Sequence, residues 1–137
     1  MGKMQFNALV NNHTVIMDTS ERSGGSDLGP TPKPLLLSAL AGCTGMDIIA
    51  LMHKKGLAPE SLNIKTEAQT GKTTPIEYVS AHVVYEIKGR AEDEAAALEA
   101  VQQSQELYCG VSHMLKRFMP ITWQVVYNHR EVFNNRA

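Results

Sequence analysis

Two cysteines, Cys43 and Cys109, are the side chains of this sequence with the most distinctive chemistry. Cys43 lies between Gly42 and Gly45 in an otherwise apolar segment, and these small neighbours leave room for a reactant to approach the sulfur. A cysteine in such a place is a packed core residue, a metal ligand or a reactive thiol. The residues around Cys43 leave all three options open.

Cys109 stands between two segments that are expected to be helical, with Gly110 directly after it. Its sulfur is therefore expected near the amino end of the second helix, where free N–H groups favour a thiolate. His113, four residues further on, would add to this effect when protonated. The alternative is a packed cysteine at a helix corner.

Each cysteine is followed four residues later by a second potential metal ligand, Asp47 after Cys43 and His113 after Cys109. On helices this spacing puts both members of a pair on one face, so that two pairs could form a four-ligand zinc site. The sequence contains no CxxC or HExxH pattern, and a four-residue spacing between common residue types is a weak signal. We therefore predict neither a metal nor another cofactor.

The composition is that of one ordinary globular domain. The chain has 137 residues, 43% of them hydrophobic and 20% charged, and a formal net charge of -1. Because no basic run is present, nucleic acid is not an expected partner. The first residues contain no apolar stretch of signal-peptide length, so we expect a cytoplasmic protein in which the cysteines do not form a permanent disulfide.

The first part of the chain predicts a β-hairpin. The segments Lys3–Val10 and His13–Asp18 alternate polar and apolar residues on either side of Asn11-Asn12, a typical turn pair. The next segment, Ser20–Pro30, is rich in glycine and serine and predicts an exposed, mobile loop without a regular element.

A long helix is expected between Thr31-Pro32, an N-cap followed by a proline at the first helical position, and the stop signal Lys54-Lys55-Gly56. Its interior, Leu35–Met52, is apolar nearly all round, which indicates a helix buried on most sides. Asp47 and two glycines argue against a membrane span. Because a small domain rarely encloses a helix by itself, we expect a second copy of the chain to cover part of it as a homodimer.

The second half predicts further strands and helices. Ser61–Thr70 and Tyr78–Lys88 alternate as strands and are expected to pair as a hairpin. A helix is expected over Glu92–Tyr108, a shorter one over Val111–Phe118, and a last strand over Ile121–Tyr127. The order of elements predicts an α+β fold in one domain with a mostly antiparallel sheet.

Two segments of the sequence resemble the OsmC/Ohr family, which includes the organic hydroperoxide resistance enzymes. Gly29-Pro30-Thr31-Pro32 leading into Leu35–Cys43 is similar to the entry to the family's central helix and peroxidatic cysteine. Tyr108–Ser112 is similar to the motif of the resolving cysteine, although proline often follows that cysteine where Gly110 stands here. The expected order of elements matches over nearly the whole chain.

The resemblance implies an intertwined α+β homodimer with long helices packed at its centre and active sites at the subunit interface. It also implies a thiol peroxidase that reduces an organic hydroperoxide, or hydrogen peroxide, to an alcohol or water. Cys43 would become a sulfenic acid, and Cys109 would condense with it to a disulfide. A dithiol such as a dihydrolipoyl group would then reduce the disulfide.

The sequence departs from the family where an activating cation is expected. Better-known members use an arginine near the first hairpin and a glutamate ten residues before the peroxidatic cysteine, where this chain has Asn11-Asn12-His13 and Lys33. We predict Arg22 as the substitute cation, with Lys33 as a second candidate, and Glu106 as the substitute carboxylate. The rival hypothesis is a non-catalytic dimer that binds a small apolar ligand between its subunits.

Overall fold

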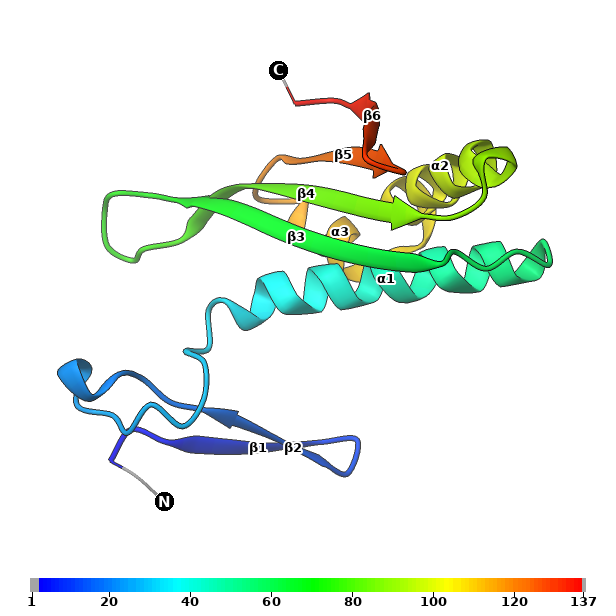
Figure 1. Ribbon diagram of the computed structural model, residues 1–137. Helices are drawn as coiled ribbons and strands as arrows, with labels where there is room; N and C mark the ends of the chain where they lie inside the picture. Colours follow the sequence, from blue (N-terminus) through cyan, green and yellow to red (C-terminus); the bar gives the residue numbers. More distant parts are fainter. Residues whose placement is uncertain (1–2, 137) are drawn as a thin grey trace. The chain divides into compact units, whose positions relative to one another are not determined.

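The computed structural model describes residues 3–136 as two compact units, one ending at Ser38 and one beginning at Ala39. The first unit contains the strands β1 (Phe6–Val10) and β2 (His13–Met17), which pair antiparallel as predicted (Figure 1). Asn11 and Asn12 have φ angles of 50° and 65°, and positive φ at both positions is what a two-residue hairpin turn requires.

The glycine- and serine-rich loop after β2 is more regular than predicted. It contains a 3₁₀ turn, Glu21–Ser23, and it is organised around the carboxylate of Asp18. That carboxylate accepts hydrogen bonds from the backbone N–H groups of Thr19 at 2.8 Å, Ser26 at 3.2 Å and Leu28 at 3.2 Å. The prediction of an exposed loop is confirmed, but the prediction that it contains no regular element was wrong, because it overlooked an acidic side chain that could organise the loop.

The long helix, α1 (Leu35–Lys54), begins three residues later than Pro32. A turn comes first, in which the N–H of Leu35 donates to the carbonyl of Pro32 at 3.1 Å. The helix ends as expected before Gly56, whose φ of 71° lets the chain turn and lets the following N–H bond back to the carbonyl of Met52 at 3.0 Å.

Only one stripe of α1 is buried by the chain itself, and its members are spaced four residues apart: Leu40, Thr44, Ile48 and Met52. The prediction of a helix buried on most sides was therefore wrong for the single chain, in which Met46 is 76% exposed. By length and composition α1 could cross a membrane, but an apolar core helix passes the same test. Its buried stripe places α1 in the core.

The second unit contains a four-stranded sheet in the order β3-β4-β5-β6. The strands β3 (Ser61–Thr70) and β4 (Tyr78–Lys88) form the predicted antiparallel hairpin, whereas β4 and β5 (Ile121–Tyr127) run parallel. The helices that connect β4 to β5 return the chain to the end of the sheet at which β4 begins. The strand β5 therefore runs parallel to β4. The sheet is thus mixed within an α+β fold that is mostly antiparallel, as predicted.

The strand β6 (Arg130–Asn134) was not predicted. It pairs antiparallel with β5 after a tight turn in which Asn128 and His129 have φ angles of 49° and 67°. This is the same turn chemistry as Asn11-Asn12 in the first hairpin. The turn pair was the available sign of a strand that is short and mostly polar.

The helical region between β4 and β5 is broken into pieces. A 3₁₀ turn, Ala91–Asp93, precedes α2 (Glu94–Gln103), and a π-helical turn, Ser104–Tyr108, follows it. Cys109 is extended, with φ -74° and ψ 101°, and α3 (Gly110–Leu115) starts directly after it. The predicted single helix over 92–108 therefore changes its hydrogen-bond pattern in its last turn.

The core lies between the helices, α1 included, and the inward faces of β4 and β5 (Figure 1). Alternate residues of β4 point into it, as the sequence pattern predicted, except that Val79 near the strand's start is exposed. The buried apolar members are Leu40, Ile48, Met52, Ala81, Val83, Tyr85, Ile87, Ala97, Ala100, Val101, Cys109, Leu115, Met119, Ile121, Trp123, Val125 and Tyr127.

Because Ile48 is fully buried in this core, Ile48→Ala is expected to lower the free energy of unfolding by about 3 kcal/mol. Leu107→Ala is the control, since Leu107 is 72% exposed, and we expect it to cost less than about 1 kcal/mol. Urea unfolding followed by circular dichroism measures both. Equal losses in the two variants would contradict the placement of the α1 stripe in the core.

Candidate active site

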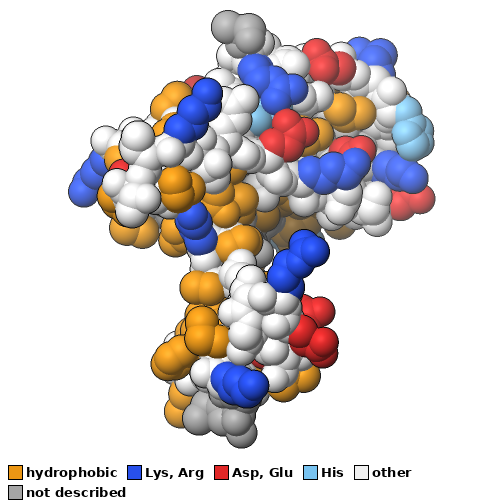
Figure 2. Space-filling model, turned by 90° about the vertical axis from the view of Figure 1, so that its left-hand side faces the viewer, with side chains coloured by type: hydrophobic (Ala, Val, Ile, Leu, Met, Phe, Trp, Pro, Cys, Tyr) orange, Lys and Arg blue, Asp and Glu red, His pale blue; other side chains and the backbone are white. Residues whose placement is uncertain are grey.

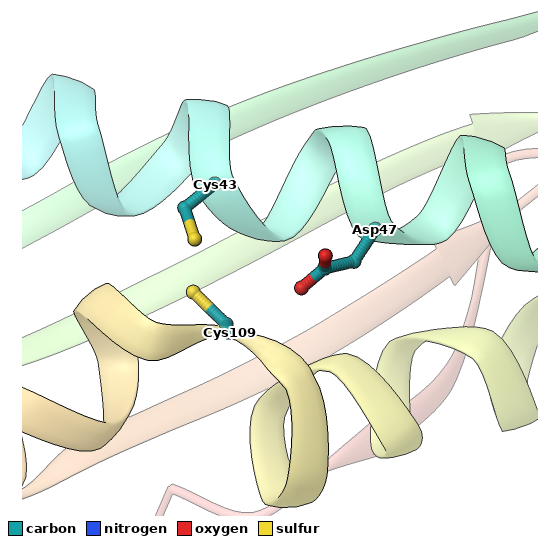
Figure 3. A group of neighbouring side chains, drawn as sticks. All are labelled: Cys43, Asp47 and Cys109. Carbon is teal, nitrogen blue, oxygen red and sulfur yellow. The ribbon is translucent and has the colours of Figure 1, made fainter.

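Three reactive side chains of the second unit meet in one place. The sulfurs of Cys43 and Cys109 and a carboxylate oxygen of Asp47 all lie within 4.8 Å of one another. Cys43 and Asp47 project from successive turns of α1 toward Cys109, and Figure 3 shows the two sulfurs facing each other. The sequence predicted that both cysteines belong to one site, and the structure brings them together.

The π-helical turn is what aims Cys109 at α1. The backbone N–H of Cys109 donates to the carbonyl of Ser104, five residues back, at 2.8 Å. The extended Cys109 then serves as the N-cap of α3, and its sulfur accepts a hydrogen bond from the backbone N–H of Ser112 at 3.3 Å. The predicted position of Cys109 at the amino end of the short helix is therefore confirmed.

The electrostatic prediction for Cys109 was wrong. Burial raises the pKa of the Cys109 thiol to about 12, and it outweighs the hydrogen bond from Ser112, which acts in the opposite direction. The neighbouring Cys43 and Asp47 raise the pKa further. Cys109 is only 2% exposed, and His113, the predicted helper, lies on the exposed side of α3. Cys109 is thus a neutral thiol near pH 7.

Cys43 differs from Cys109 in its access to solvent. It is partly buried on α1, whereas Cys109 is enclosed. Cys43 is therefore the more solvent-accessible of the two cysteines. This difference favours separate tasks for the two thiols.

A buried chain of polar side chains runs beneath the sulfurs. Ser104 Oγ donates to the Asp47 carboxylate at 3.0 Å and lies 2.7 Å from Thr44 Oγ1, which in turn lies 2.8 Å from Tyr85 Oη. Gln105 Nε2 donates to Tyr85 Oη at 2.6 Å. Every member of this chain except Asp47 is essentially inaccessible to solvent.

The chain closes on the second cysteine through Ser112. The Ser112 hydroxyl donates to Gln105 Oε1 at 2.7 Å, while the backbone N–H of Ser112 donates to Cys109. Burial raises the pKa of Tyr85 to about 12, so its phenol is a neutral donor at physiological pH. The network therefore links α1, β4, the π-helical turn and α3 around the sulfurs.

The same three side chains are the residues that could hold a metal ion. Two thiolates and a carboxylate suit zinc, and Ser104 would orient the carboxylate from behind. The four-ligand zinc set considered from the sequence does not form among residues 3–136, because His113 lies outside the group. The donor set is three protein ligands, with Cys109 held as a neutral thiol.

Of the other predicted site residues, Arg22 belongs to the first unit and Glu106 to the second. Arg22 lies in the 3₁₀ turn of the first unit, and its role as an activating cation stays a prediction. Glu106 is exposed on the π-helical turn, close enough to Lys116 to raise the pKa of that ammonium, although burial lowers it more. Lys116 also interacts electrostatically with Cys109.

Sequence reasoning missed most of the supporting residues. Lys116 was not considered, although its ammonium donates to the carbonyl of Gln105 at 2.6 Å and lies 5.2 Å from the centre of the Trp123 ring. Asp47 was considered as a metal ligand and as an argument against a membrane span, but not as a partner of the thiols. Its i, i+4 spacing from Cys43 was the signal that could have identified it as a partner of the thiols.

Comparison with known proteins agrees with this geometry. Residues 24–124 match the family described as OsmC-like protein, and the matched region contains both cysteines and Asp47. The chain belongs to the OsmC-like protein family. The resemblance seen in the two cysteine motifs is thereby confirmed.

Three proteins illustrate what this OsmC-like chain is similar to. It is 26% identical to Protein YhfA of Escherichia coli over 110 residues, which are 80% of this chain and 79% of YhfA. A hypothetical protein from Aquifex aeolicus has a TM-score of 0.76 at 25% identity, covering 93% and 92% of the two chains. An organic hydroperoxide resistance protein OsmC from Legionella pneumophila has a TM-score of 0.60 at 16% identity, covering 89% and 96%.

Tyr85→Phe tests the buried network of this OsmC-like chain. The change removes the hydroxyl group that accepts from Gln105, so a buried amide donor loses its partner. We expect the free energy of unfolding to fall by about 1–3 kcal/mol. Tyr108→Phe, at a 57% exposed tyrosine, is the control and is expected to change it by less than about 0.5 kcal/mol. An unchanged stability of Tyr85→Phe would contradict the network.

Proposed function

We propose that this OsmC-like protein is a thiol-dependent peroxidase that acts on organic hydroperoxides, with hydrogen peroxide as a further substrate. The observation that carries the proposal is the pair of sulfurs within 4.8 Å, one of them accessible and one enclosed. Family membership and the name of the Legionella relative, an organic hydroperoxide resistance protein, support a role in resistance to peroxides.

The proposed reaction has two steps. The Cys43 thiolate attacks the terminal peroxide oxygen, an S–O bond forms and the O–O bond breaks, and the alkoxide leaves as an alcohol after taking a proton. Sulfur is oxidised by two electrons and the peroxide is reduced by two. Cys109 then attacks the sulfur of the Cys43 sulfenic acid, so that a disulfide forms and water leaves.

The disulfide returns to two thiols by exchange with an external dithiol, for which a dihydrolipoyl group is the proposed class. Arg22 is the proposed cation that supports the Cys43 thiolate, and Glu106 the proposed carboxylate, both as substitutes for the family's pair. A cytoplasmic location is proposed with this chemistry, because the cycle needs a reducing compartment.

We also propose that the active form is a homodimer. A two-stranded hairpin is marginally stable alone, yet β1 and β2 carry exposed apolar side chains, among them Phe6 at 68% and Leu9 at 77%. Figure 2 shows hydrophobic side chains at the surface of the first unit. In the second unit, a groove of about 700 Å³ follows the apolar face of α1, lined by residues such as Met46, Ile49 and Leu62.

The apolar groove is also the feature that supports the rival hypothesis, in which a non-catalytic dimer binds a small apolar ligand. The two functions differ in what they require of the thiols. A ligand-binding wall needs no reactive cysteine, whereas a peroxidase must oxidise both. Peroxide chemistry at the cysteines therefore decides between them.

Addition of one equivalent of an organic hydroperoxide to the reduced protein is expected to remove two hydrogen masses, measured on the intact non-reduced chain. Cys43→Ser is expected to show no change, because the attacking sulfur is absent. Cys109→Ser is expected to gain one oxygen mass as a sulfenic acid, which dimedone traps.

The matched control is Ser38→Cys in the Cys43→Ser background, which restores the thiol count without restoring the sulfur beside Cys109. This variant is expected to form no intramolecular disulfide. Free thiols in the wild type after excess peroxide would contradict the peroxidase, and metal analysis of the purified protein would then test the Cys43, Asp47 and Cys109 donor set.

Sedimentation equilibrium is expected to give twice the chain mass of 15.1 kDa. Leu9→Glu is expected to shift the equilibrium toward the monomer, because it places a charge on an apolar surface that the second copy would cover. Lys72→Glu, a charge change in the loop between β3 and β4, is the control. A monomeric wild type at micromolar concentration would contradict the dimer.

A further inference from the structure

Formation of the disulfide poses a proton-transfer problem that the site must solve. Cys109 has to lose its proton before or as its sulfur attacks Cys43, yet burial raises the pKa of the Cys109 thiol to about 12. At neutral pH this thiolate would therefore form only rarely by itself. A nearby group that accepts the proton would remove this limit.

Asp47 is placed to accept it. Its carboxylate lies within 4.8 Å of both sulfurs, a separation that direct contact or one bridging water can span. Figure 3 shows the carboxylate on the side of α1 that faces Cys109. Tyr85 and Lys116 also interact electrostatically with members of this group, but Tyr85 is a neutral donor, and the Lys116 ammonium donates to the carbonyl of Gln105. Glu106, the predicted carboxylate, is exposed.

The buried network holds this carboxylate in place, and its hydrogen bonds all donate toward Asp47. A carboxylate only accepts hydrogen bonds, and Asp47 at 3.0 Å is a nearer acceptor for the Ser104 hydroxyl proton than the Thr44 carbonyl at 3.5 Å, so this proton points to Asp47. Thr44 must then donate to Ser104, and Tyr85 must donate to Thr44. The amide of Gln105 donates to Tyr85 and completes the sequence.

This order leaves no hydroxyl of the chain able to take up a proton from Cys109. Each hydroxyl group already donates its proton toward Asp47, and the amide at the far end is not a base. Four buried side chains thus hold one carboxylate beside two thiols. A carboxylate that only faced solvent on the surface of α1 would not require these buried hydrogen-bond partners.

We propose that Asp47 takes the proton from Cys109 and delivers it to the hydroxide that leaves Cys43, as the acid-base residue of disulfide formation. This inference rests on the proposed function in one respect, that Cys109 attacks a Cys43 sulfur bonded to a leaving group. It adds Asp47 to the catalytic residues already proposed, which are Cys43, Cys109, Arg22 and Glu106.

The step balances. The S–S bond forms and the S–OH bond of Cys43 breaks, while the Cys109 proton passes through the Asp47 carboxylate to the leaving hydroxide and gives water. Relative to the sulfenic acid and the thiol, the Cys43 sulfur is reduced by one electron and the Cys109 sulfur is oxidised by one electron, so the electrons balance within the pair. No further oxidant or reductant enters.

The test uses an aromatic disulfide, dithionitrobenzoate, so that it does not depend on peroxide. Cys43 attacks the reagent and releases one coloured thiolate, and Cys109 then displaces the second from Cys43. Stopped-flow absorbance separates the two phases. Asp47→Asn is expected to slow the second phase by roughly 100-fold at neutral pH, and the first phase, measured in the same trace, separates this loss from any change at Cys43.

The pH profile distinguishes lost proton transfer from lost structure. In Asp47→Asn the second phase is expected to rise about tenfold per pH unit from about pH 7 to about pH 9, because only the rare Cys109 thiolate reacts. The wild type is expected to be nearly flat over this range, and Asp47→Glu to regain part of that flatness. Glu99→Gln, an exposed carboxylate-to-amide change on α2, is the control and is expected to match the wild type.

Two outcomes would overturn the inference. One is a second phase in Asp47→Asn with the wild-type rate and pH profile. The other is a wild-type second phase that itself rises about tenfold per pH unit, which requires no variant to fold. If the wild type consumes no peroxide but Asp47→Asn still slows the second phase, the proposed peroxidase fails while the role of Asp47 stands.

Discussion

The hydroxyl groups of Thr44 and Ser104 meet at 2.7 Å between α1 and the π-helical turn, and the geometry of the site depends on this contact. Thr44 follows Cys43 directly, and Ser104 accepts the N–H of Cys109 at its carbonyl. The contact therefore ties the backbones that carry the two sulfurs. It lies in the core, where a polar group without a partner would be costly, so the two segments are held in one register.

Most of the fold could be predicted from local patterns. The two hairpins follow from alternation and turn residues, and α1 follows from its apolar length and its glycine stop. The cysteine pair could also be predicted, because the surrounding motifs resemble those of a known family and that family's model covers 24–124. What failed in the fold were features that depend on one side chain, such as Asp18 in the loop, or on a short polar strand such as β6.

The environment of the site could not be predicted in the same way. Whether the amino end of α3 or burial controls the Cys109 thiol depends on how much protein covers it, and sequence spacing does not give that quantity. Thr44, Ser104 and Gln105 are common polar residues on apolar helix faces, and only tertiary contact shows that they bond to one another. The buried stripe of α1 hides Thr44 among leucine, isoleucine and methionine for the same reason.

Trp123 gives the site an optical reporter. It is the single tryptophan of the chain, it is buried on β5, and its ring lies 5.2 Å from the Lys116 ammonium. The Lys116 ammonium donates a hydrogen bond to the carbonyl of Gln105 and interacts electrostatically with Cys109. A change in the position of this ammonium would alter the electric field across the indole ring, so the emission of Trp123 is an intrinsic probe of the surroundings of the buried network.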